Sequence, residues 1–187
     1  HVAAWLHDCG KVTTPEFIVD KATKLETLYD RIHEIRMRFE VLKRDAQIAM
    51  HEAMAAGVPP AQARAEMEQA CRVLDEEFAF VAACNQGGEY LSPLQQQRLQ
   101  DIAQRSWTRT LDDALGISQE EAQRRAHLPK APLPVQEQLL SDKPEHRIER
   151  APQDRIAPGN PWGFRIDVPE LLYNRGELHN LQVSRGT

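Results

Sequence analysis

The amino-acid sequence predicts an all-α fold: a long, coiled-coil-like antiparallel helical hairpin with shorter helices and a Pro-rich, irregular C-terminal part. Three observations predict it: two heptad patterns between residues 26 and 86, the short turn that separates them, and eight prolines between residues 129 and 169. Aromatic residues make up only 6% of the chain. Leu, Ala, Ile and Met would therefore supply most of the core.

The first heptad pattern predicts one arm of the hairpin over residues 26–57. Its apolar or small residues are spaced alternately four and three apart, the spacing of a helix seam. They are Leu28, Ile32, Ile35, Phe39, Leu42, Ala46, Ala49 and Ala53. The run Gly57-Val58-Pro59-Pro60 ends this helix.

The second heptad pattern predicts the returning arm over residues 60–86. The same alternation continues through Met67, Cys71, Leu74, Phe78 and Val81. Gly87-Gly88 then ends the helix. Because the connecting turn is so short, the two helices are expected to fold back on each other.

Two capping signals predict shorter helices after the hairpin. Ser92-Pro93 with Gln95 starts a helix that would reach about Trp107, and Ser118 with Glu121 starts one that would reach about Ala126.

Beyond residue 127 the prolines predict loops and extended chain. We expect one further helix over Val135–Ser141 and a last turn over Pro169–Asn174. We expect the segment to wrap around the helices through Trp162, Phe164 and Ile166.

Composition and charge exclude several classes of function. The 187 residues carry a formal net charge of −5 and a pI near 5.8, which gives no electrostatic basis for binding a nucleic acid duplex or an anionic membrane. No apolar run approaches the length that spans a bilayer. The cysteines, Cys9, Cys71 and Cys84, include no C-x-x-C spacing, so we expect reduced thiols in a cytoplasmic protein.

The sharpest chemical signal is the run His7-Asp8-Cys9-Gly10-Lys11. Average composition would place His-Asp-x-Gly-Lys in about one chain of this length in a thousand. A neutral imidazole and a carboxylate are both good ligands for divalent ions, and a carboxylate can bridge two of them. Gly10 can end a short helix and free Lys11 to approach a phosphate as a point charge.

This run resembles the core of HD-GYP phosphodiesterases, which belong to the HD superfamily of metal-dependent phosphohydrolases. Beyond His7-Asp8-x-Gly10-Lys11, the matching positions are Pro15, Ile18, Lys21, Lys24 and Leu25. The resemblance implies an all-α enzyme of bacterial signalling that hydrolyses cyclic di-GMP with two or more divalent ions, such as Fe or Mn. It implies His7 and Asp8 as metal ligands, with Asp8 and Lys11 taking part in catalysis.

The rest of the sequence departs from this family. No Gly-Tyr-Pro signature follows, and the heptad pattern begins where the family has an acidic helix with a metal-binding His. The family's upstream His is also missing, and His1 is not assigned to that role. We therefore expect a piece of a longer protein. Residues 1–25 would be a partial catalytic core, residues 26–127 a helical insertion, and residues 128–187 an extended segment returning to the core.

Three functions remain open from the sequence. The first is a cyclic di-GMP phosphodiesterase whose other metal ligands lie outside this chain, so that this piece alone would be inactive and bind metal weakly or not at all. The second is a non-catalytic hairpin that mediates homodimerisation or binds a partner. The third is an HD-type phosphohydrolase acting on other nucleotides.

The other histidines and Cys71 are expected to be structural or solvated. His33 and His51 fall on the polar faces of the first arm, and Cys71 falls in the seam of the second. His127, His146 and His179 have no partner at the spacing of metal ligands.

Overall fold

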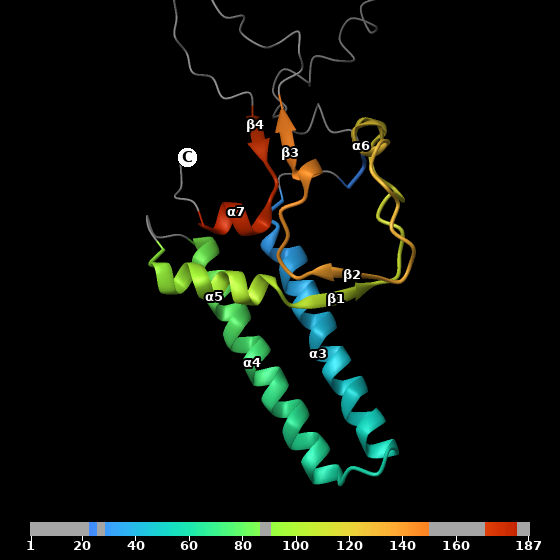
Figure 1. Ribbon diagram of the computed structural model, residues 1–187, viewed down its shortest axis with the longest axis vertical. Helices are drawn as coiled ribbons and strands as arrows, with labels where there is room; N and C mark the ends of the chain where they lie inside the picture. The colour runs from blue at the N-terminus through green and yellow to red at the C-terminus, as the bar shows by residue number, and fades with distance from the viewer. Residues whose placement is uncertain (1–22, 26–28, 87–90, 150–170, 183–187) are drawn as a thin grey trace, which may run out of the picture.

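Two long helices pack side by side as an antiparallel hairpin and dominate the computed structural model of the chain (Figure 1). The structure describes residues 23–25, 29–86, 91–149 and 171–182. Helix α3 spans Ile32–Ala55 and helix α4 spans Pro60–Gln86, so each is roughly 35–40 Å long at 1.5 Å per residue. The predicted helical fold and its hairpin are confirmed.

The turn of the hairpin is fixed by Gly57, whose φ of 96° lies in the left-handed region. Val58 N donates to Ala53 O at 3.0 Å and Gly57 N donates to Met54 O at 3.1 Å. This pair of hydrogen bonds is the Schellman motif, which satisfies the last carbonyls of α3 and favours glycine at its left-handed position. The chain then turns back into α4 at Pro60, where a proline at the first helical position costs no hydrogen bond.

Helix α3 begins at Ile32, six residues later than predicted. The side chain of Asp30 accepts a hydrogen bond from Ile32 N at 3.0 Å, and Asp30 O accepts one from His33 N at 3.2 Å. An aspartate that binds the free amides ahead of it favours a helix start over a helix interior. The heptad spacing alone did not reveal this boundary.

Helices α5 (Pro93–Ala103) and α7 (Glu177–Gln182) lie across the open end of the hairpin (Figure 1). Ser92 caps α5 with the predicted capping box, and Ser118 caps the short helix α6 (Gln119–Arg125). Helix α7 was not predicted.

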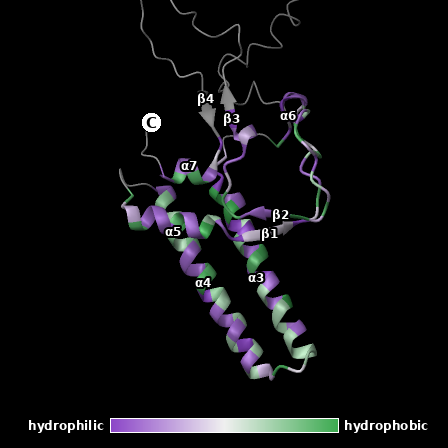
Figure 2. Cartoon of the chain, in the orientation of Figure 1, coloured by the Kyte–Doolittle hydropathy of each residue, from purple (hydrophilic) through white to green (hydrophobic). Residues whose placement is uncertain are grey.

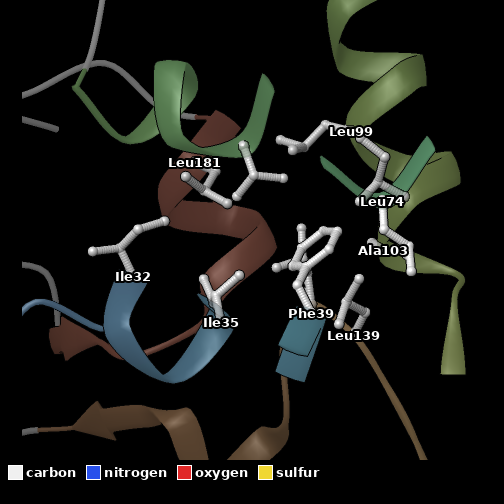
Figure 3. Close-up of a cluster of buried hydrophobic side chains, with 11 residues drawn as sticks. Ile32, Ile35, Phe39, Leu74, Leu99, Ala103, Leu139 and Leu181 are labelled. Atoms are coloured by element: carbon white, nitrogen blue, oxygen red, sulfur yellow. The ribbon is translucent and has the colours of Figure 1, made fainter. Parts of the chain in front are cut away.

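The core of the protein lies where these helices meet. Figure 3 shows side chains from α3, α4, α5 and α7, with Leu139, converging around Phe39. Leu99, Leu139, Leu140 and Val81 are wholly buried. Burying an aliphatic side chain of this size contributes about 1.5–3 kcal/mol.

Two short antiparallel ribbons complete the described part of the chain. Strand β1 (Ser106–Arg109) pairs with β2 (Val135–Gln138), with Ser106 opposite Gln138. Strand β3 (Arg147–Glu149) follows a 3₁₀ turn, η2 (Pro144–His146), and pairs with β4 (Leu171–Asn174).

Three sequence predictions are wrong here. Val135–Gln138 is a strand, where a helix was predicted. Helix α5 ends at Ala103 and does not reach Trp107, because Trp107 and Thr108 pair with β2; such residues favour strands. The predicted final turn is strand β4 where the structure describes it, from residue 171 onward. The predicted contacts of Trp162, Phe164 and Ile166 lie outside the described residues.

Burial along the hairpin is uneven. Ile35 and Phe39 are each 3% exposed, and Leu74 and Val81 are buried opposite them. From residue 43 to residue 73, a stretch that the structure describes throughout, Ala63 is the only buried residue, and Ala49 of the predicted seam is exposed. Figure 2 shows hydrophilic residues interleaved with apolar ones along this part of both helices. We call residues 43–73 the arm and the remaining described residues from 29 onward the head.

Among the described residues, no helix combines the length and the apolar character needed to cross a membrane.

Candidate functional site

The residues that the sequence singles out for chemistry lie outside the described part of the chain. His7, Asp8 and Lys11 all fall before residue 23. Their assignment as metal ligands and catalytic residues therefore remains a prediction. Within the described residues, no group of three or more His, Cys, Asp or Glu side chains is arranged to hold a metal ion.

The most constrained polar group in the described head is the carboxylate of Glu177, at the first position of α7. Glu177 is 4% exposed and is the buried charged residue among those that the structure describes. Its Oε2 accepts a hydrogen bond of 2.6 Å from Arg38 Nη1 and a weaker one of 3.3 Å from Ser141 N. Its Oε1 lies 2.8 Å from Arg31 Nη2, an ion pair without hydrogen-bond geometry.

The two arginines around Glu177 are themselves held in place. Arg38 Nη1 also donates to Leu139 O at 3.0 Å, and its guanidinium lies over the Trp107 ring, 5.8 Å from the ring centre. Arg31 donates to the backbone oxygen of Arg175. Glu177, Arg31 and Arg38, which we call the latch, therefore join the start of α3 to the start of α7.

A second ionic cluster lies along the β1–β2 ribbon. Glu137 pairs with Arg109 at 3.0 Å and with Lys143 at 3.2 Å, while Asp113 pairs with Arg125 at 2.6 Å. Burial acts to raise the pKa of both carboxyl groups. The hydrogen bonds and charges of their cationic partners outweigh burial, so that the pKa of each is lowered. Both groups are therefore held as carboxylates.

A polar pocket of about 110 Å³ lies between α6 and the turn before β3. Its lining residues are Asp113, Glu121, Arg124, Arg125, Lys143, Glu145, His146 and Arg175. Arg125 pairs with Asp113, Arg124 with Glu120, and Arg175 with Glu121. Because the pocket's arginines already have acidic partners, the pocket does not present the unpaired positive charge that a phosphate group requires.

His146 in this pocket favours its neutral form. Burial lowers the pKa of His146, and the positive charge of Arg31 lowers it further. Its Nδ1 lies 3.2 Å from Lys143 N and accepts that hydrogen bond. His33, His51, His127 and His179 are exposed. The surface positions predicted for His33 and His51 are confirmed.

An apolar groove of about 480 Å³ runs between α3 and α4 beside the start of β1. Its floor is formed by Leu42, Ala46, Ala70, Val73 and Leu74, and Arg105 and Ser106 border it. Cys71 is half-buried next to this seam, and its thiol lies 3.7 Å from Met67 Sδ. This packing agrees with the structural role predicted for Cys71.

Comparison of the whole chain with protein-family models, with curated proteins and with solved structures finds no significant match in any of the three. The resemblance to HD-type phosphohydrolases therefore rests on the residues between Val2 and Leu25 alone.

Sequence reasoning missed the latch. Glu177 belongs to no motif and no heptad, and it lies 139 residues from its partner Arg38. The one local signal is that Glu177 follows Gly176 and precedes Leu178 and Leu181 at helical spacing, which predicts a helix start but no partner.

Proposed function

We propose that the chain is part of an HD-type metal-dependent phosphohydrolase of the HD-GYP kind, which hydrolyses a cyclic dinucleotide such as cyclic di-GMP. The observation that carries this proposal is the spacing His7-Asp8-x-Gly10-Lys11, continued in register to Leu25. The chain's own donors suit hard or borderline divalent ions, since imidazole and carboxylate are both ligands of such metals. When bound, the ions would stabilise the negative charge that develops during phosphoester hydrolysis.

His7 and Asp8 would bind the ions in this proposal, and Lys11 would bind a phosphate oxygen of the substrate as a point charge. These residues cannot complete the ligand shells of two ions by themselves. The remaining ligands would come from sequence outside this chain. We propose that the chain by itself is inactive for this reason.

The arrangement of the head supports the view that the hairpin is an insertion within the catalytic domain. An inserted unit must leave and rejoin its host at neighbouring points, because the host's own fold has to continue across the gap. Arg31 lies just before α3 and Glu177 just after β4, and their side chains are 2.8 Å apart. The chain thus returns to its starting point after 146 residues.

The proposal is tested by metal content and hydrolysis. The 187-residue chain and a longer protein that carries it are each loaded with Mn²⁺, desalted and assayed with cyclic di-GMP. We expect metal retention and turnover in the longer protein and not in the chain alone. His7→Ala and Asp8→Asn in the longer protein should each abolish both, while Lys11→Met should reduce turnover and leave metal content unchanged.

Substrate class is tested in the same assay. Cyclic di-GMP, a nucleoside triphosphate and a simple phosphomonoester are compared at equal concentration. Faster hydrolysis of the triphosphate than of cyclic di-GMP would show that the substrate is a nucleotide and not a cyclic dinucleotide. The metal site itself would be refuted if neither protein retained Mn²⁺, or if the His7→Ala variant of the longer protein retained as much Mn²⁺ as the unmodified longer protein.

A second candidate function is self-association or partner binding through the hairpin, without catalysis. The groove between α3 and α4 and the exposed Met37 and Ile48 on α3, 62% and 55% exposed, favour it. Sedimentation of the 187-residue chain tests self-association. A concentration-dependent dimer that Ala46→Glu abolishes would support it, and a strict monomer at all concentrations would exclude the homodimer.

A further inference from the structure

The returning segment, residues 171–182, is tied to the head by a row of directional bonds. Arg175 N donates to His146 O at 2.8 Å, Glu177 N donates to Ser141 O at 3.3 Å, and His179 N donates to the Asp142 carboxylate at 3.0 and 3.2 Å. All three acceptors lie between β2 and β3. The segment therefore follows a defined path across the head, and Leu181 completes it by entering the core.

The latch adds ion pairs to these contacts at Glu177, within the returning segment. A buried ion cluster commonly adds little stability over apolar side chains of the same volume, because removing the charges from water costs as much as their attraction returns. An ion cluster differs from apolar packing in that its contacts depend on orientation, so the charged groups pair well in one arrangement only. The side chain of Glu177 is 1% exposed, whereas those of Arg38 and Arg31 are 16% and 31% exposed. Water can therefore reach the two guanidinium groups, but it can take their place at the carboxylate only if the segment moves.

Arg31, just before α3, and Arg38, within α3, lie seven residues apart and contact the same carboxylate. Arg31 reaches Oε1, and Arg38 reaches Oε2. If α3 rotated or slid relative to α7, the two distances would change by different amounts. Both contacts can be kept only when α3 and the returning segment hold one relative orientation.

The geometry points to a coupling device: the latch fixes the returning segment to the start of α3. Any displacement of the hairpin would therefore move the segment that enters α3 and the returning segment together. Through Arg31, the latch binds the chain entering the hairpin, and through Glu177 it binds the chain leaving the head. A partner that tilts the hairpin would thereby shift the chain at Arg31 and the chain at Glu177 at the same time. This inference concerns the described residues alone and does not depend on the proposed function.

The test is amide hydrogen exchange of the 187-residue chain and three variants. Glu177→Gln keeps the shape of the side chain and removes its charge, Arg31→Gln removes the outer partner, and Glu177→Asp keeps the charge on a shorter stem. We expect the amides of Arg175, Glu177 and His179 to exchange roughly tenfold faster or more in the first two variants, the factor that losing one charge-assisted hydrogen bond corresponds to. Glu177→Asp should restore part of the protection.

Glu137→Gln is the matched control, because Glu137 is also a partly buried carboxylate between two cations, and its partners Arg109 and Lys143 both lie outside the returning segment. It should leave the three amides unchanged. The inference is overturned if Arg31→Gln leaves them unchanged, or if Glu137→Gln accelerates them equally. It is also overturned if Glu177→Gln accelerates every amide of α3 by the same factor, because that result would mean general unfolding rather than release of the segment. Arg31→Gln keeps the test decisive should Glu177→Gln fail to fold.

Discussion

The head and the arm of this protein share the same two heptad patterns, one in α3 and one in α4, and yet are held together differently. In the head, the seam positions carry Ile, Phe, Leu and Val, and these side chains are buried against α5, α7 and Leu139. In the arm, the seam positions carry Ala, Met and Cys, and two helices alone cannot enclose them. The difference teaches that a heptad spacing predicts which residues face each other, whereas burial depends on what else covers the seam.

The polar contacts differ in the same way. Where the arm meets the head, Lys43 of the arm pairs with Asp75 of the head at 2.7 Å, and the Asp75 side chain is 63% exposed. The head is bridged by the latch, whose central carboxylate is buried. A solvent-exposed pair contributes little because water competes for both charges, while breaking a buried pair leaves a charge without compensation.

The largest expected effect comes from the centre of the head. Phe39→Ala should lower the free energy of unfolding by about 3–5 kcal/mol, because the lost ring leaves a cavity among α3, α4 and α5. Met37→Ala is the matched control on the same helix, since Met37 is 62% exposed, and should change it by no more than about 0.5 kcal/mol. Urea denaturation of both variants measures the contrast. Equal losses would mean that the head has no distinct core.

The turn at the tip of the arm should show a smaller effect. Gly57→Ala places a side chain at φ 96°, and a left-handed conformation costs a non-glycine residue about 1–2 kcal/mol. No atom lies within 4 Å of the added Cβ position, so backbone strain is the sole cause. Thermal unfolding measures the loss. A neutral or stabilising Gly57→Ala would show that the Schellman turn does not limit the arm.

Acid pH should weaken the ribbon cluster. The pKa of Glu137 is lowered from its ordinary 4.5 and that of Asp113 from 3.8. Because folding favours the ionised form of both, their contribution is fully present above those ordinary values. It is lost as the pH falls through the lowered values. The free energy of unfolding should fall over that window, and Glu137→Gln should flatten the fall. An unchanged slope in the variant would contradict the assignment.

The smallest expected effect is at the Lys43–Asp75 pair, where the arm meets the head. A double-mutant cycle of Lys43→Met and Asp75→Asn should give a coupling of about 0–1 kcal/mol. The hydrogen bond and charge of Asp75 raise the pKa of Lys43, so the sign of the coupling should be favourable. A coupling well above 1 kcal/mol would show that this ion pair contributes substantially to holding α3 and α4 together at this point.

The sequence predicted the hairpin because heptad spacing, the Gly57 turn and the prolines at residues 59 and 60 are all local signals. It predicted the starts of α5 and α6 through Ser92 and Ser118 for the same reason. The strands were missed because strands of three or four residues carry too short a pattern, and the residues of β2 pair with residues 26 to 32 positions earlier in the chain. Neither propensity nor spacing encodes such a pairing.

The candidate functional residues also differ in whether a local sequence pattern reveals them. The motif with His7, Asp8 and Lys11 is a local pattern and could be recognised in the sequence, although its geometry lies outside the described residues. The latch could not be recognised, because Glu177 lies 139 residues beyond Arg38 and 146 beyond Arg31 in the sequence. Buried charge pairs depend on tertiary packing, and a short stretch of sequence does not show which distant residues pack together.

Native-state hydrogen exchange of the unmodified chain in low denaturant tests the contrast between head and arm most directly. We predict that amides of residues 36–42 and 75–84 exchange only through global unfolding, whereas amides of residues 47–54 and 62–70 exchange through local opening of lower free energy. Such a result would establish that side-chain burial in the head, and not the heptad seam, carries the stability of the hairpin. Equal opening free energies in the two regions would contradict the account.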